Sequence, residues 1–355
     1  MVKTLIKLSL SAPSGKRVKV VKKGLYLFVL SFIAMACDKK FSPPTPIEPE
    51  PVANITDTGF GCKTLPTAPE PFGFTDSTRD ENENINCFMY NPSNPEDLII
   101  KVNGDIFGYN KIYKVNLPTR KFTFLGNGSD YLPQVNKKNW LVYSDIENQV
   151  WRIKTNGDSA MLLTFMKNCM EPKWDRTGNF ILYYQEAYST IPPRILKVDL
   201  KGAIVDYWEV DLNQFATYHR SDKFLIQRSK DAQVTIYEKD LVANTERALI
   251  SASYSPKGNR YFSNLVVDHL DENFYWSNTA GVFRCNINSL KIDTVFKACP
   301  NYNLLYPNLS VYYPDELTVV CRLKTPLTSS VIYHDYRAYQ VNLLSRSVTW
   351  IKVFK

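Results

Sequence analysis

Three histidines are the first candidates for chemistry in this 355-residue chain, because histidine is the commonest general base and metal ligand. They are His219, His269 and His334, and no two have the His-x-x-x-His spacing that places two ligands on one helix face. The acidic residues around His269, among them Asp268 and Asp271, are more typical of a solvated loop than of a metal site. The histidines would form a catalytic group only by converging in space.

The chain lacks the signatures of several enzyme classes. It contains no Gly-x-Ser-x-Gly, the motif that presents the serine nucleophile of α/β-hydrolases. It contains neither a Walker loop nor the Gly-x-Gly-x-x-Gly motif of dinucleotide binding. Paired carboxylates for glycoside chemistry need proximity in space, which the sequence does not test. We predict no catalytic residue, no metal and no cofactor, while an enzyme stays the alternative.

The N-terminal residues predict an export signal. Residues 1–36 carry seven Lys and Arg and no Asp or Glu, and they end in the apolar run 25–36. About 20 apolar residues are needed to span a bilayer, so this run is too short for a membrane helix. A basic segment followed by a short apolar run is typical of a signal peptide.

The end of this run suggests a lipid anchor. Ala34, Met35 and Ala36 precede Cys37. Small residues before a cysteine resemble the lipobox of bacterial lipoproteins, here of the Bacteroidetes type. The resemblance implies that residues 1–36 are removed and that Cys37 carries acyl chains. Several chains would hold the protein stably at a membrane. We therefore expect a lipid-anchored protein of the cell envelope, at the outer membrane and facing either the periplasm or the exterior, with the inner membrane as the alternative. The alternative is an ordinary signal peptide cut nearby.

Residues 37–80 are predicted to be a lipidated N-terminus and a proline-rich tether. Proline favours extended polyproline geometry, so residues 38–51 would span roughly 40 Å at about 3.1 Å per residue. Residues 52–80 have the alternative of packing on the domain as a strap. Eight of the 21 prolines lie in this segment: Pro43, Pro44, Pro46, Pro49, Pro51, Pro66, Pro69 and Pro71.

One strand pattern recurs six times in the rest of the chain. Each copy alternates apolar and polar residues, the period of a half-buried strand, and turn residues follow it. The central bulky residues are spaced by 38, 45, 41, 46 and 56 residues. The copies are residues 111–116, 149–154, 194–199, 235–240, 281–286 and 337–342, and their central residues are Tyr113, Trp151, Leu196, Tyr237, Phe283 and Tyr339.

Two further strands precede each copy, most clearly in residues 171–184. There one strand ends at Trp174, a tight turn uses Gly178, and a second strand runs back from Phe180. Four strands in each of six repeats predict an all-β fold, a six-bladed β-propeller of antiparallel blades over residues 81–355. The alternative is a seven-bladed propeller with a degenerate blade in residues 52–80. The long last spacing predicts an insertion near residues 290–306.

The phrase from Pro172 to Ile181, Pro-x-Trp-Asp-x-Thr-Gly-x-x-Ile, resembles the repeats of TolB-like propellers. The resemblance covers roughly residues 82–355 and implies the fold, whereas TolB-like propellers serve both binding proteins and enzymes. We expect a non-enzymatic binding or scaffold module for a protein or polysaccharide partner. The alternative is a lyase or hydrolase acting on glycan. Tyr131, Tyr188 and Tyr302 are candidates for loop-tip aromatics that stack on a sugar or anchor a peptide.

Six cysteines remain besides Cys37. No Cys-x-x-Cys occurs, which disfavours a zinc or thioredoxin-type site. Disulfides persist in the oxidising compartment that an exported protein meets, and six cysteines allow 15 pairings. A Cys62–Cys87 disulfide would join the strap to the first blade, and buried free thiols are the alternative. The six are Cys62, Cys87, Cys169, Cys285, Cys299 and Cys321.

The basic character of the whole chain belongs to the export signal. The formal net charge is +8, from 43 Lys and Arg against 35 Asp and Glu. Removal of the seven charges of residues 1–36 leaves 36 against 35, a net charge of +1. Without a basic surplus the mature domain has no electrostatic reason to bind nucleic acid, and we predict none.

Overall fold

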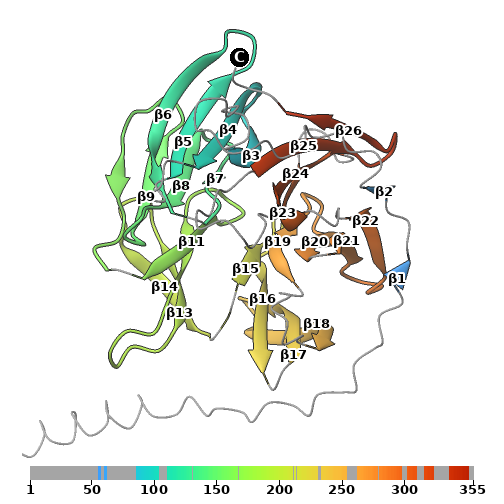
Figure 1. Cartoon of the computed structure of the whole chain (residues 1–355). Coiled ribbons are helices and arrows are strands. Elements are labelled where there is room, and N and C mark those ends of the chain that lie inside the picture. The colour runs from blue at the N-terminus through green and yellow to red at the C-terminus, as the bar shows by residue number, and fades with distance from the viewer. Residues whose placement is uncertain are drawn as a thin grey trace, which may run out of the picture. The chain divides into compact units, whose positions relative to one another are not determined.

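The computed structural model describes residues 55–56, 60–61, 85–103, 110–129, 131–166, 168–210, 212, 214–230, 233–253, 262–278, 280–297, 302–309, 316–323 and 336–351. Cys37, the predicted signal peptide and most of the predicted tether lie outside these residues. The regular elements in the described part are all β-strands (Figure 1). No helix in that part is long and apolar enough to cross a membrane.

Six sheets of four consecutive strands form the blades, as predicted. Blade 1 has β3 (Ile85–Asn91), β4 (Asn94–Asn103), β5 (Asn110–Asn116) and β6 (Lys121–Gly128), and blade 2 has β7 (Gln134–Val135), β8 (Trp140–Ser144), β9 (Val150–Lys154) and β10 (Met161–Leu162). Blade 3 has β11 (Cys169–Trp174), β12 (Ile181–Gln185), β13 (Arg194–Val198) and β14 (Ile204–Glu209), and blade 4 has β15 (Gln214–Thr217), β16 (Lys223–Lys230), β17 (Gln233–Asp240) and β18 (Thr245–Ser253). Blade 5 has β19 (Ser263–Val267), β20 (Asn273–Asn278), β21 (Gly281–Asn286) and β22 (Ile292–Lys297), and blade 6 has β23 (Tyr302–Leu309), β24 (Glu316–Leu323), β25 (Tyr336–Asn342) and β26 (Ser347–Trp350).

The order of strands within each blade places the first strand at the centre of the ring. Neighbouring strands of a blade pair antiparallel, in chain order. The first strands of successive blades contact one another, as β11 contacts both β7 and β15. The third strands β5, β9, β13, β17, β21 and β25 coincide with the six repeats found in the sequence.

The turn residues explain why the repeats end as they do. In five blades an Asp or Asn at the end of the third strand accepts main-chain hydrogen bonds from the turn that follows. Asp199 Oδ1, for example, accepts from Lys201 N at 2.8 Å and from Ala203 N at 2.9 Å. These are Asx turns, which favour a tight reversal. The predicted turn at Gly178 is confirmed, with a φ of 63° that glycine adopts without strain.

Six apolar clusters hold the blades together, one between each pair of neighbours. Most of the repeated central residues lie in them or pack against them, and Leu196 and Tyr339 are almost fully buried. One cluster joins Phe88 and Ile100 of blade 1 to Val320 and Ala338 of blade 6, so it closes the ring. Burial of one such side chain contributes about 1.5–3 kcal/mol.

The segment before blade 1 adds strands to blade 5 and does not form a seventh blade. β1 (Ile55–Thr56) and β2 (Phe60–Gly61) pair parallel with β22, the outer strand of blade 5. The seven-bladed alternative is therefore wrong, and the strap is confirmed for these four residues. The prediction of a Cys62–Cys87 disulfide is also wrong, because Cys87 is a free, buried thiol. Cys169 and Cys285 are buried as well, and neither forms a disulfide.

The prediction of an insertion near residues 290–306 is wrong. Within those residues β22 ends at Lys297 and β23 begins at Tyr302, which leaves a short connection. The extra length lies in residues 324–335, between β24 and β25. This connection is longer than the corresponding one in every other blade. The spacing of third strands carries no information on which connection is long, so the sequence misplaced it.

Candidate functional site

The ring has two faces with different construction. We call one face the turn face, because it carries the tight turns that join the first strand of a blade to the second and the third strand to the fourth. We call the opposite face the loop face, because it carries the connections between the second and third strands of a blade and the connections between blades. Antiparallel strands reverse direction at each turn, so the two kinds of connection alternate between the faces.

Side-chain contacts link the turns of neighbouring blades on the turn face. Asn91 Nδ2 of blade 1 donates to Asn139 Oδ1 of blade 2 at 3.0 Å. Asn136 Nδ2 of blade 2 donates to Gly178 O of blade 3 at 3.2 Å. The series continues with blade 4, where Arg176 and Asp222 form an ion pair at 2.9 Å. We call this series of contacts the turn belt.

Two of the three histidines belong to the turn belt. His219 N donates to Asp271 Oδ1 at 2.7 Å, and Arg220 N donates to Asp271 Oδ2 at 2.8 Å. The His219 ring nitrogen Nε2 lies 3.1 Å from Val267 O, and His269 O accepts from Arg220 Nε at 3.0 Å. The structure thus places His219 and His269 in one contact between blades 4 and 5, where they link main chains. His334 lies outside the described residues.

The acidic residues near His269 close a turn. Asp268 Oδ1 accepts from Glu272 N at 2.9 Å, and Asp268 Oδ2 accepts from Asn273 Nδ2 at 2.8 Å. With Asp271 bound to blade 4, both carboxylates already have main-chain partners. In the described part of the chain, no three His, Cys, Asp or Glu residues are grouped as metal ligands.

We expect Asp271→Ala to destabilise the domain by about 2 kcal/mol, because hydrogen bonds to a charged group contribute about 1.5–3 kcal/mol. The loss would leave the N–H groups of His219 and Arg220 without their carboxylate. Chemical denaturation measures the effect. Glu272→Ala is the matched control, since the Glu272 side chain makes no interaction with the described residues. Equal stability of the two variants would contradict a structural role for the turn belt.

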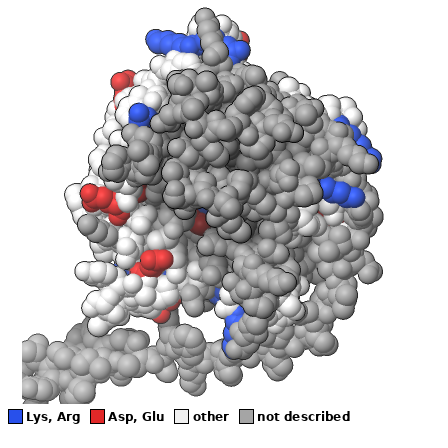
Figure 2. All heavy atoms as spheres, viewed as in Figure 1, with Lys and Arg blue, Asp and Glu red and all other residues white. Residues whose placement is uncertain are grey.

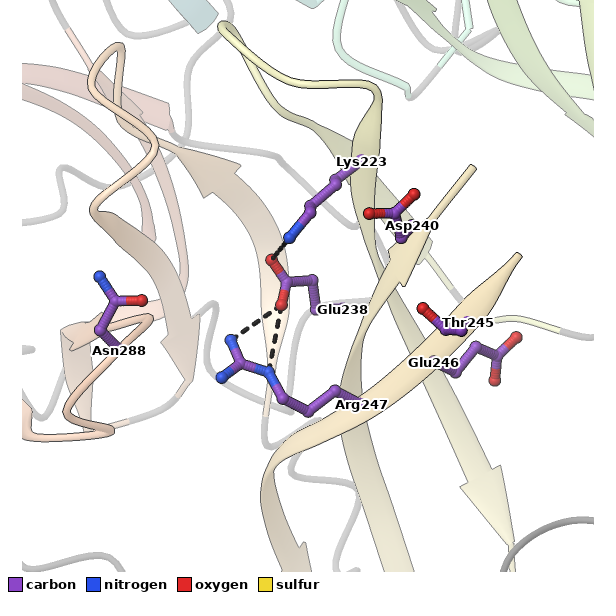
Figure 3. Close-up of a pocket in the computed structure, with 7 residues that line it drawn as sticks. All are labelled: Lys223, Glu238, Asp240, Thr245, Glu246, Arg247 and Asn288. Carbon is purple, nitrogen blue, oxygen red and sulfur yellow. Dashed lines mark hydrogen bonds and ion pairs between the residues drawn. The ribbon is translucent and has the colours of Figure 1, made fainter. Parts of the chain in front are cut away.

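A shallow pocket on the turn face lies between blade 4 and the turn after β21 of blade 5 (Figure 3). Figure 3 shows Lys223 and Arg247 converging on Glu238, whose side chain is 9% exposed. Lys223 Nζ lies 3.1 Å and Arg247 Nη2 2.8 Å from its two oxygens. Arg247 Nη2 also donates to Ile287 O of blade 5 at 3.3 Å. Both cations are thus paired with Glu238, and Arg247 connects two blades, so the pocket is a structural joint.

The loop face carries exposed apolar side chains on adjoining connections of blades 2 and 3. Ile146, Phe165 and Tyr188 are 47%, 88% and 61% exposed, and we call them the loop-face patch. Main-chain hydrogen bonds tie their connections together. Asn148 O accepts from Cys169 N at 2.9 Å, and Asn168 O accepts from Glu186 N at 3.1 Å.

Local hydrogen bonds hold the loop-face patch in place. Asp145 Oδ1 accepts from the main chain of Glu147 and of Gln149, each at 2.9 Å, which presents Ile146 at the tip of a tight turn. Tyr188 and Ile191 exchange two main-chain hydrogen bonds, at 3.1 and 2.9 Å. The backbone of such turns is held in place before a partner arrives, which lowers the entropic cost of binding.

Of the three tyrosines predicted at loop tips, the structure places only Tyr188 on the surface. Tyr131 is half-buried, and its hydroxyl lies 2.7 Å from Met170 Sδ. The side chain of Tyr302 lies outside the described part. Phe165 is not among the residues predicted from the sequence, although an aromatic residue in the connection between two blades is a signal that could have indicated it.

The charged surface agrees with the near-neutral composition of residues 37–355. On the face that Figure 2 shows, the described Lys and Arg and the described Asp and Glu are scattered among uncharged residues. Several cations are paired with carboxylates, as in the Arg228–Glu246 ion pair at 2.6 Å.

Comparison with known proteins identifies the fold. No protein-family model and no curated protein matches the chain. A putative TolB from Agrobacterium tumefaciens matches with a TM-score of 0.51 and 14% identity, over 69% of this chain and 88% of that one. TolB from Acinetobacter baumannii matches with a TM-score of 0.44 and 13% identity, over 68% of this chain and 65% of that one. At these identities the likeness concerns the fold alone. The chain is a six-bladed β-propeller whose solved structural neighbours include TolB-like propellers.

Proposed function

We propose that this protein is a lipid-anchored binding module of the cell envelope, which docks a protein or polysaccharide on the loop-face patch. The observation that carries the proposal is the exposure of Ile146, Phe165 and Tyr188 on connections that hydrogen-bond to one another. Exposed aromatic side chains with a fixed backbone are typical anchors of interfaces, and they also stack on sugar rings. The export signal and Cys37 support the location.

The described residues favour binding over catalysis. His219 and His269 are engaged in the turn belt, and the charges of the turn-face pocket are paired with one another. An enzyme would instead hold a base or nucleophile toward an open site. A glycan-processing enzyme stays the second candidate only through the residues that the structure does not describe.

The test is crosslinking in intact cells followed by capture of the protein. We expect a specific neighbour that is lost, at least tenfold, in Phe165→Ser/Tyr188→Ser. The matched control is Val242→Ser/Leu344→Ser, which removes side chains that are 82% and 76% exposed on the turn face. The control should retain the neighbour. Loss in the control and retention in the patch variant would contradict the proposal.

A further inference from the structure

The outer strand of blade 3 exposes large apolar side chains. Ile204, Val205 and Tyr207 of β14 are 52%, 55% and 51% exposed. In the part of the chain that the structure describes, β14 pairs with β13 alone, so it forms the edge of its sheet. Apolar side chains grouped at one exposed place mark an interaction surface. We call these three residues, together with Arg194 of β13, the blade 3 edge.

Arg194 lies against the ring of Tyr207. The carbon at the centre of its guanidinium is 5.4 Å from the centre of that ring, and its Nε donates to Gln185 Oε1 at 2.8 Å. The other N–H groups of this half-buried guanidinium make no hydrogen bond or ion pair with the described residues. Glu209 pairs in register with Arg194 across the two strands, but it forms no ion pair with it. The guanidinium is thus held in place without a carboxylate.

Blade 4 shows the same arrangement with a carboxylate in place. Arg228 lies over the ring of Tyr237, at 5.2 Å from its centre. Its Nη1 and Nη2 donate to the two oxygens of Glu246, at 2.6 and 3.0 Å. This is the bidentate geometry in which arginine recognises carboxylates. Arg194 has the same stacking on a tyrosine, so its outer N–H groups are suited to a carboxylate that a partner supplies.

The blade 3 edge is continuous with the loop-face patch. The amide of Gln185 connects the two, because its Oε1 accepts from Arg194 and its Nε2 donates to Met166 Sδ at 3.3 Å. Met166 directly follows Phe165 of the patch. Gln185 is only 1% exposed, so this connection is buried beneath the surface. A partner that docks on Phe165 can therefore also reach Arg194 and Tyr207.

The side chains of this surface favour a protein partner over a sugar. Sugar rings stack on aromatic faces, whereas Ile146, Ile204 and Val205 are aliphatic and match the apolar side chains of a protein interface. The edge of β14 is also protected against the addition of a strand, since Tyr207 N donates to Asp206 Oδ1 at 2.8 Å. The partner would therefore bind mainly through its side chains.

We propose that the partner of the loop-face patch is a protein that presents an Asp or Glu carboxylate beside apolar side chains. The carboxylate binds the guanidinium of Arg194, and the apolar side chains pack on Tyr207, Ile204 and Val205. This inference rests on the proposed docking at the loop-face patch and names the chemistry of the partner. Arginine and tyrosine are among the residues that contribute most to the binding energy of interfaces.

Selection from a phage-displayed library of random peptides on the purified full-length protein tests the proposal. We expect the selected sequences to share an Asp or Glu next to aromatic or aliphatic residues. A synthetic peptide with the selected sequence should bind at least tenfold more tightly than the same peptide with that residue changed to Asn or Gln. Selected peptides without a shared acidic residue, or equal binding of the two synthetic peptides, would overturn the proposal.

The variants Arg194→Gln and Tyr207→Ser should each weaken binding of this peptide at least tenfold. Tyr207→Ser leaves the contact of Arg194 with Gln185 in place, so it tests the edge without loss of that hydrogen bond. Arg228→Gln is the matched control, because Arg228 lies over a tyrosine in the same way but is already paired with Glu246. It should bind as the wild type does. Unchanged binding in both edge variants, or equal loss in Arg228→Gln, would contradict the assignment.

Crosslinking in intact cells separates this inference from the proposed function. The neighbour that Phe165→Ser/Tyr188→Ser loses should be a protein, and Arg194→Gln should lose it at least tenfold as well. If Arg194→Gln and Tyr207→Ser both retain the neighbour, or if the neighbour is a polysaccharide, this inference is overturned while docking on the loop-face patch stands.

Discussion

Replacement of Cys37 by Ser is expected to move the protein from the membrane fraction of its cells to the soluble fraction. The lipobox-like residues before Cys37 predict acylation of its sulfur, and a serine offers no thiol for that reaction. Each buried CH₂ of an acyl chain contributes about 0.8 kcal/mol to membrane binding, so several chains hold a protein far more firmly than one.

Fractionation and the intact mass of the mature chain measure this effect. The mass of the wild type should show acyl chains on a chain that begins at Cys37. Cys62→Ser is the matched control, because it removes a thiol 25 residues further on without changing the predicted export signal. It should stay in the membrane fraction. A Cys37→Ser variant that also stays there would contradict the lipid anchor.

The sequence predicted the six blades because the relevant signals are local. Each third strand alternates apolar and polar residues, and an Asp or Asn such as Asp199 closes the turn that follows. Both features depend only on neighbours in the chain, so they recur wherever the repeat does. Blade 2 departs from this pattern, because Lys154 stands at the end of its third strand in place of Asp or Asn. There Asn156, two residues later, accepts a hydrogen bond from Asp158 N at 3.1 Å.

Features that depend on contacts between blades could not be predicted from the sequence. β1 and β2 have two residues each, and only their pairing with β22 makes them strands. Lys173 follows a proline in β11, and its side chain is buried because the neighbouring blade covers it. The histidines were named as candidates for chemistry, but His219 and His269 act through main-chain atoms as well as through a ring.

Closure of the ring rests on side chains. Blade 1 and blade 6 each take all four strands from one continuous stretch of chain, so no described strand is exchanged between the two ends. The joint consists of apolar residues such as Phe88 and Val320. Since each blade is stabilised by both neighbours, weakening of this one joint should lower the stability of the whole domain.

We therefore expect Phe88→Ala to destabilise the domain by about 3–5 kcal/mol, the usual cost of removing a buried aromatic ring. For a domain of this size, this corresponds to a decrease in Tm of roughly 10 °C. Phe88 is 2% exposed, whereas Phe165 is 88% exposed, so Phe165→Ala is the matched control and should change stability by less than about 0.5 kcal/mol. Calorimetry measures both variants.

Val320→Ala, on the blade 6 side of the same joint, should also lower the Tm. If Phe88 and Val320 act in one joint, the double variant will lose less than the sum of the two single losses, because residues in contact are not independent. Additive losses would show that the two blades are stabilised separately. A Phe88→Ala variant as stable as Phe165→Ala would show that the ring is closed by other residues.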